Sequence, residues 1–322
     1  MIKIKNSILS ISILFYLSGC SLPQQITGEY YLQQQKYKNG IEFFQQKISQ
    51  DDQDSTSYYY LGRFLLAKNK TKEAIPYLEK AIKLDNSKSN YYSWLGVSYG
   101  TLDLYKEEMK AYKKALLLDK KNIQALTYLA HNYFDSNLYI KALNYYNKVL
   151  KISPQNQTSL YNRALILGKL ERTPEQLQAY KEYLSYYPFG TLARKSVTQI
   201  NKIGNFDYEN LSLAYQNTTI KSIKFKPLST DIDINSKESL NIIGNILSKN
   251  KKINLHIISY QLNNKKLAKE KVKKIKTYLL KRFKTIDPYR LKLSWFDNPK
   301  IKKFGNNKYI LNEYIQFIAE VN

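Results

Sequence analysis

The stretch that decides the fold reads YSWLGVSYGTLDLYKEEMKAYKKALLLD, residues 92–119. It places a small residue, Gly96, in its first half and a large ring, Tyr112, in its second half. Two antiparallel helices pack closely only where one offers a small side chain and a ring from the other fills the notch. The stretch therefore predicts a hairpin of two helices.

The same pairing of a small and a large residue returns every 34 residues along the chain. The small residues are Gly28, Gly62, Gly96, Ala130 and Ala164. The large residues are Phe44, Leu78, Tyr112, Tyr146 and Tyr180. A single helical hairpin cannot bury its apolar face, so stacked neighbours must do so. The period predicts an all-α solenoid.

This pattern resembles the tetratricopeptide repeat family: a small residue in the first helix, a large one in the second, and a proline near the repeat end. Other clear copies are YYYLGRFLLAKNKTKEAIPYLEKAIKLD (58–85) and LTYLAHNYFDSNLYIKALNYYNKVLKISP (126–154). The phase holds without insertion over about five repeats, and TLARKSVTQINKIG after Pro188 is interpreted as a capping helix ending near Gly204. The predicted repeat domain spans residues 28–204.

In the resembled family, the first helices line a groove that holds a protein segment. Each lining residue taken alone is equally explained as a solvated helix position, and the prediction concerns the groove as a whole. By repeat position, the lining residues here are Tyr59, Arg63, Asn90, Val97, Gln124, Thr127, His131 and Tyr161.

The chain begins MIKIKNSILSISILFYLSGC, with two lysines, a short apolar run and its only cysteine, Cys20. The run is too short to span a bilayer and is typical of a secretory signal. Leu17-Ser18-Gly19-Cys20 resembles the lipobox of bacterial lipoproteins. That resemblance implies a signal peptide over 1–19, a lipidated Cys20, and a short tether over 20–27. With Ser21 following the cysteine, it implies the periplasmic face of the outer membrane.

Beyond a predicted linker at 205–217, the 34-residue phase stops and strand and helix patterns alternate. Strands are expected at 220–225, 253–261, 290–297 and 309–321, with helices at 236–250 and 267–283. This β-α-β-α-β-β order over 218–322 resembles the OmpA-like domain, a peptidoglycan-binding module. The expected fold class is thus a repeat solenoid followed by a small α+β domain.

The tail departs from that family at the positions that would clamp a wall peptide. Leu262 stands where the family has an aspartate, Lys271 where it has an arginine, and Glu313 and Tyr314 where it has an arginine pair. A lysine keeps the charge but cannot form a bidentate fork. We interpret the domain as one that lost the clamp. Either a residual cationic wall contact or a solvated helix face explains Lys269, Lys271, Lys273 and Lys274.

No pattern of catalytic residues is found in the 322-residue sequence. The two histidines, His131 and His256, lack a second ligand or a nucleophile at motif spacing, and no glycine-rich phosphate loop occurs. We predict a non-enzyme without cofactor or metal. The formal charge of +25 favours anionic neighbours, and outside the cytoplasm nucleic acid is not an expected partner.

The sequence leaves three functions open. The first is a lipid-anchored scaffold for protein partners, similar to lipoproteins that help type IV or tight-adherence pili and their secretins assemble. The second is a scaffold that recruits peptidoglycan synthases or hydrolases. The third is a tether between wall and membrane, which would need the clamp that Leu262 removes.

Overall fold

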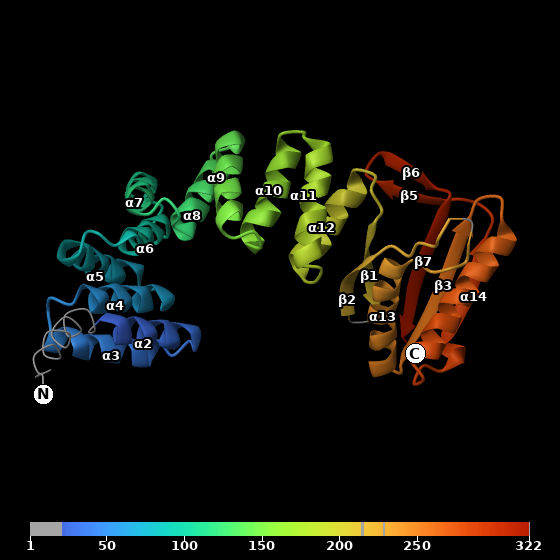
Figure 1. The fold of residues 1–322 in the computed structure, drawn as a ribbon, viewed down its shortest axis with the longest axis horizontal. Helices are drawn as coiled ribbons and strands as arrows, with labels where there is room; N and C mark the ends of the chain where they lie inside the picture. Colours follow the sequence, from blue (N-terminus) through green and yellow to red (C-terminus); the bar gives the residue numbers. More distant parts are fainter. Residues whose placement is uncertain (1–20, 214–215, 228, 322) are drawn as a thin grey trace, which may run out of the picture. The chain divides into compact units, whose positions relative to one another are not determined.

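The computed structural model describes residues 21–213, 216–227 and 229–321, and Figure 1 shows their elements. Cys20 and the expected signal peptide lie outside the described residues. The chain divides into two compact units, one up to Pro154 and one from Gln155. Within the described residues, no helix combines the length and apolar character needed to cross a membrane.

The first unit consists of four helical hairpins, as the 34-residue period predicts. In each hairpin a first helix is followed, after a turn of a few residues, by a second helix that packs against it. The pairs are α2 (Ser21–Gln33) with α3 (Tyr37–Gln50), α4 (Ser55–Ala67) with α5 (Thr71–Leu84), α6 (Ser89–Gly100) with α7 (Tyr105–Leu118), and α8 (Ile123–Asp135) with α9 (Tyr139–Ile152).

The turn inside every hairpin contains one residue in the left-handed backbone region, and these residues are again 34 apart. They are Gln35, Asn69, Asp103, Asn137 and Glu171, with φ between 55° and 59°. The following residue donates its N–H to a carbonyl five residues back, as Lys70 does to Leu65. This is a Schellman-type ending, which satisfies carbonyls at the end of the first helix. Asn and Asp tolerate the left-handed region better than most residues.

The notch between small and large residues forms as expected. Tyr112 is fully buried, and a Cβ added at Gly96 would lie 2.5 Å from its Cε1 atom. In the first hairpin, Gly40 replaces the usual alanine because the ring of Phe64, from the next hairpin, lies directly against its backbone. The notch therefore fixes the spacing of helices both within and between hairpins.

Replacing Gly96 with valine tests this notch. Because the Tyr112 ring is buried on all sides, the added methyl groups force it out of place, and we expect a loss of about 1–3 kcal/mol in unfolding free energy. Thermal or urea denaturation measures the loss. Adding Tyr112→Leu, which imitates the Gly62–Leu78 pair, should restore part of it; an unchanged midpoint for Gly96→Val alone would contradict the packing argument.

The second unit joins three helices to a small domain with strands. Its helices are α10 (Gln157–Lys169), α11 (Thr173–Tyr186), α12 (Thr191–Lys202), α13 (Ile234–Lys249) and α14 (Lys265–Arg282), with the short 3₁₀ helix η1 (Pro288–Arg290). Its strands are β1 (Tyr208–Leu213), β2 (Gln216–Lys221), β3 (Ile253–Gln261), β4 (Leu291–Phe296), β5 (Lys300–Phe304), β6 (Asn307–Leu311) and β7 (Glu313–Val321).

The main sheet has the order β4-β3-β7, flanked by the hairpins β1-β2 and β5-β6. Strand β3 pairs parallel with β4 and antiparallel with β7. Helix α14 packs against β3 and β4 and also contacts α13. The apolar faces predicted for the two helices, Leu240, Ile243 and Leu247 on one and Val272, Ile275 and Leu279 on the other, meet Leu255 and Ile257 of the sheet in one core.

Two local expectations for this unit need correction. Ser236 was expected to cap the second-unit helix α13, but the helix begins at Ile234 and the side chain of Asp233 accepts the capping bond from the N–H of Asn235. Ser236 is buried and exchanges hydrogen bonds with the backbone of Lys224. The strand expected at 220–225 lies at 216–221, where it pairs with β1.

The segment 205–217, treated as a linker in the sequence, contains strand β1 and the most heavily bonded carboxylate of the second unit. Asp207 accepts hydrogen bonds from Lys181 of α11 at 2.6 Å and from Lys224 and Asn205. Burial alone would raise the pKa of Asp207, but these hydrogen bonds outweigh it and hold the pKa far below its ordinary value. Tyr309 of β6 also donates to the carbonyl of Lys202. The last helices and the strands therefore pack as one body.

Candidate functional site

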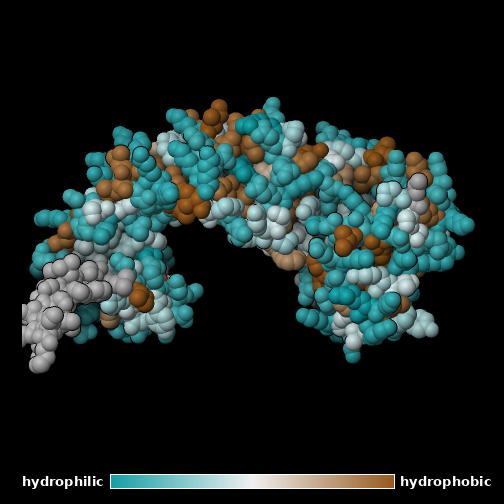
Figure 2. Space-filling model, in the orientation of Figure 1, coloured by the Kyte–Doolittle hydropathy of each residue, from teal (hydrophilic) through white to brown (hydrophobic). Residues whose placement is uncertain are grey.

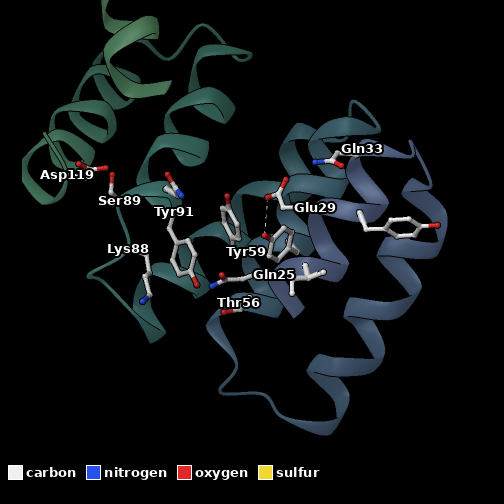
Figure 3. A pocket seen from close by; sticks show the side chains of 13 residues that line it. Gln25, Glu29, Gln33, Thr56, Tyr59, Lys88, Ser89, Tyr91 and Asp119 are labelled. Atoms are coloured by element: carbon white, nitrogen blue, oxygen red, sulfur yellow. Dashed lines mark hydrogen bonds between the residues drawn. The ribbon is translucent and has the colours of Figure 1, made fainter. Parts of the chain in front are cut away.

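A groove of about 690 Å³ lies along the first helices of the first unit (Figure 3). We call it the tyrosine groove. Its lining comes from α2, α4, α6 and the turn after α7. The residues used below are Gln25, Glu29, Thr56, Tyr59, Tyr60, Lys88, Asn90, Tyr91 and Asp119.

Two stacked rings form the floor of the tyrosine groove. The centroids of Tyr59 and Tyr91 are 4.7 Å apart, and both residues are buried. Burial raises the pKa of Tyr59 to about 12, although the nearby Arg63 lowers it in part. The phenol therefore stays protonated at neutral pH and remains a hydrogen-bond donor. Figure 3 shows Tyr59 and Tyr91 between Gln25 and Glu29 on one side and Ser89 on the other.

One ion pair supports this floor. Arg63 donates to Glu29, and the Tyr60 hydroxyl donates to the same carboxylate at 3.0 Å. The guanidinium also lies over the ring of Trp94 at 4.5 Å and over Tyr59 at 5.4 Å. Its Nε is buried and has no hydrogen-bond acceptor within the described chain. Arg63 thus holds the groove floor rigid instead of reaching into the groove.

Of the predicted groove residues, Tyr59 and Asn90 line this cavity and Arg63 lies against its floor. Val97 is half-buried against the cluster around Tyr112. His131 is half-buried between Tyr128 and Tyr146, with ring centroids 5.8 and 5.7 Å away.

The remaining predicted groove residues have local or separate roles. Burial lowers the pKa of His131, while Asp135 raises it in part, so the ring is uncharged at neutral pH. Gln124 and Thr127 are half-buried on α8, and Thr127 bonds back to the carbonyl of Ile123. Tyr161 belongs to the second unit, where it contacts Tyr180 and Tyr183.

Sequence reasoning missed the part of the groove that comes from the first repeat. Gln25 and Glu29 stand 34 residues before Tyr59 and Arg63, and Thr56 stands 34 before Asn90. The signal was therefore present: one more step back along the period finds all three. The bond between Arg63 and Glu29 joins side chains at equivalent repeat positions.

A lysine interrupts the helix caps at the edge of the groove. Helices α4, α8 and α10 begin after Asp54, Asn122 and Asn156, whose side chains each accept a backbone N–H of the first turn. The equivalent position before α6 is Lys88, which makes no such bond and lines the groove instead. A lysine at this position forgoes the stabilisation that Asn or Asp gives.

Lys88→Asn is expected to raise the unfolding free energy by about 1 kcal/mol, because it restores the missing cap. The lost pair with Asp85 is exposed and contributes about 0.5 kcal/mol or less. Urea denaturation measures the change. Lys83→Asn, on the exposed interior of α5, is the matched control and should destabilise by a few tenths of a kcal/mol. A destabilised Lys88→Asn would show that this lysine stabilises the helix start in another way.

The lysines of α14 do not form one cationic surface. Lys271 is fully buried and pairs with Glu313 at 2.7 Å and Gln261 at 2.6 Å. Lys269, Lys273 and Lys274 are exposed; Lys269 lies over Trp295, and the other two pair with Glu270 and Asp231. Leu262 is exposed. The ammonium at the former clamp position is therefore already engaged inside the domain.

His256 of β3 bonds to Ser294 at 2.8 Å, across the β3–β4 pair. Over the described ranges, no group of three or more His, Cys, Asp or Glu side chains is placed to hold a metal ion. The polar groups of the tyrosine groove are suited to hydrogen bonding and ring contact with a polypeptide.

The comparisons with known proteins identify the repeats. Residues 55–88, 89–122 and 123–156 each match the tetratricopeptide repeat family, and no enzyme family is indicated. A search of curated proteins finds no match.

Three solved structures are similar to parts of the chain. A crystal structure of MamA is 18% identical, covering 60% of this chain and 97% of that chain, with a TM-score of 0.43. YrrB, described as a TPR protein with an unusual peptide-binding site, is 17% identical, covering 57% and 95%, with a TM-score of 0.42. Pseudomonas aeruginosa PilF is 18% identical, covering 47% and 71%, with a TM-score of 0.42.

The helical hairpins, the 34-residue period and the family match agree, and repeats of this kind bind protein partners in a groove. Residues 55–156 are therefore three consecutive tetratricopeptide repeats.

Proposed function

We propose that this protein is an outer-membrane-anchored lipoprotein and a scaffold for assembling an envelope machine, such as a type IV or tight-adherence pilus with its secretin. The tyrosine groove is the observation that carries the proposal. It combines a rigid aromatic floor with polar and charged groups of both signs along its edge. Such a lining suits a polypeptide segment that offers both apolar side chains and free hydrogen-bonding groups.

The position of the groove fits an anchored protein. Helix α2 begins at Ser21, directly after the proposed lipidated Cys20, and its residues Gln25 and Glu29 already line the groove. At 1.5 Å per helical residue, Glu29 lies roughly 14 Å along the chain from the anchor. A partner in the groove is then held next to the membrane, as assembly of a membrane complex requires.

The cost of the missing cap supports binding as the role of Lys88. An ammonium group at the groove edge attracts an acidic side chain or a carboxyl terminus of the partner. In this proposal the stability forgone at the start of α6 is exchanged for that contact. Stability and function are often in conflict at binding sites.

For the second unit we propose an OmpA-like domain that docks on protein and does not clamp the wall. The pairing of Lys271 with Glu313 supports this reading, because an ammonium already bound to a carboxylate has no charge to offer a wall peptide. The same pairing disfavours a wall tether. A scaffold for wall synthases or hydrolases uses the same architecture and remains the alternative that the experiment must separate.

The test is crosslinking in intact cells with a photoreactive amino acid at position 90, followed by mass spectrometry of the captured proteins. Asn90 is exposed at the groove edge, so the substitution leaves the core untouched. We expect pilus or secretin components, lost when Lys88→Asn is added and absent from a probe at Asn144, an exposed position of α9 outside the groove. Cys20→Ser should release the protein from membranes.

Each other result has a defined meaning. Wall synthases or hydrolases captured at position 90 would replace the pilus reading with the alternative. Equal capture from positions 90 and 144 would place the partner elsewhere. Membrane retention of Cys20→Ser would overturn the lipid anchor.

A further inference from the structure

A second groove lies on the other side of helix α6. It has a volume of about 760 Å³ and runs along α6 and α7. Its floor consists of Tyr92, Leu95 and Tyr99 from α6 with Met109 and Leu117 from α7. Its edge carries four lysines of α7: Lys106, Lys110, Lys113 and Lys114. We call it the lysine-rimmed groove.

The two grooves use opposite faces of α6. Asn90 and Val97 belong to the face predicted for the first groove, whereas Tyr92 and Tyr99 each stand two residues further on. Two residues correspond to a rotation of roughly 200° about a helix axis. The lysine-rimmed groove is therefore separate from the tyrosine groove, and one occupant cannot fill both.

The floor of the lysine-rimmed groove is apolar and held in place. The Tyr99 hydroxyl donates to Glu79 of α5 at 3.0 Å, and Leu95 is buried. Leu117 is 77% exposed, the most exposed leucine in the described parts of the chain. In the space-filling view, brown hydrophobic residues lie among teal ones over the helices of this unit (Figure 2). An apolar hollow of this size marks a surface that contacts another molecule.

The rim is strongly cationic. All four lysines are exposed, and none has an ion-pair partner within the described ranges of the chain. Lys114 lies over the ring of Tyr92, with 5.9 Å between Nζ and the ring centroid. Glu107 is the single acidic residue of the lining. The net charge of the groove therefore selects an anionic occupant.

We propose that the lysine-rimmed groove docks an amphipathic helix of a second partner protein, apolar on one face and edged with Asp and Glu. The lining of α7 runs from Lys106 to Leu117, a length of roughly 18 Å, which matches three turns of a helix. Helices bind apolar grooves through side chains spaced at i, i+3, i+4 and i+7. Acidic residues along the edges of such a helix meet the lysine rim.

Two other occupants fit the charge and shape less well. A second copy of this chain, with a formal charge of +25, would bring like charges together at the rim. An anionic bilayer supplies the charge, but a flat surface cannot fill a hollow of this volume. A helical segment satisfies both the shape and the charge.

The experiment measures binding of fluorescein-labelled synthetic peptides to the full chain by anisotropy. The probe is a 16-residue amphipathic helix with leucines on one face and glutamates along its edges. The controls are a scrambled peptide of the same composition and a peptide with lysine in place of every glutamate. We expect the acidic helix to bind at least tenfold more tightly than either control, and its affinity to fall with added salt.

Two variants assign that binding to the groove. The double change Lys110→Glu and Lys114→Glu should weaken the acidic probe at least tenfold, and Leu117→Asp should do the same without harming the fold, because Leu117 is exposed. The matched control is Lys141→Glu with Lys148→Glu. These lysines of α9 also lie over tyrosine rings, Tyr133 and Tyr145, but outside the groove, and the control should bind like the unchanged protein.

The proposal fails if the scrambled peptide binds as tightly as the helix, since the attraction is then charge alone. It also fails if the α9 control weakens binding equally. Competition by vesicles of anionic lipid, or self-association abolished by Leu117→Asp, would assign the groove to a membrane or a second copy. Asn90→Arg, which alters only the tyrosine groove, should leave the peptide affinity unchanged; a loss would merge the two sites.

Discussion

Close contact between a small residue of one helix and a buried ring of the next sets the geometry of the repeats. Gly96 against Tyr112 is the clearest case, because no Cβ fits between them. The contact recurs every 34 residues, and so does a left-handed residue in the turn between the helices. Packing in a dense interior and the fixed direction of each turn leave one way to stack the hairpins. Equivalent side chains then fall in register, which is how Glu29 and Arg63 come to form a pair.

Function in this architecture rests on the positions that the packing does not need. The notch fixes the core, and the outward faces of the first helices are left free to differ between repeats. Lys88 stands where neighbouring repeats have a capping Asp or Asn, and it lines the tyrosine groove. The opposite face of α6 forms the apolar floor of the lysine-rimmed groove. A single helix thus separates two surfaces of different chemistry, as suits a scaffold that holds two partners.

The second unit shows how a changed residue can be compensated from another part of the chain. Lys271 and Glu313 are both departures from the OmpA-like pattern, and the structure joins them in one buried pair with Gln261. A buried ammonium is costly without a partner. Each departure read alone removes a wall contact, but together they stabilise the packing of α14 on β7. In this interpretation a former binding site has become part of the domain interior.

The sequence alone determined the helical hairpins, their period and the main elements of the tail, because these follow from local spacing of small, large and apolar residues. The periodic apolar faces of α13 and α14 and the limits of β3 were found correctly for the same reason. Only the tertiary structure decided what depends on residues distant in sequence. It placed Asp233 and not Ser236 at the cap of α13, paired β1 with β2 inside the expected linker, and buried Lys271. The grooves belong to the same class, since each needs side chains from different helices to meet, and spacing along one chain segment does not state which free faces will do so.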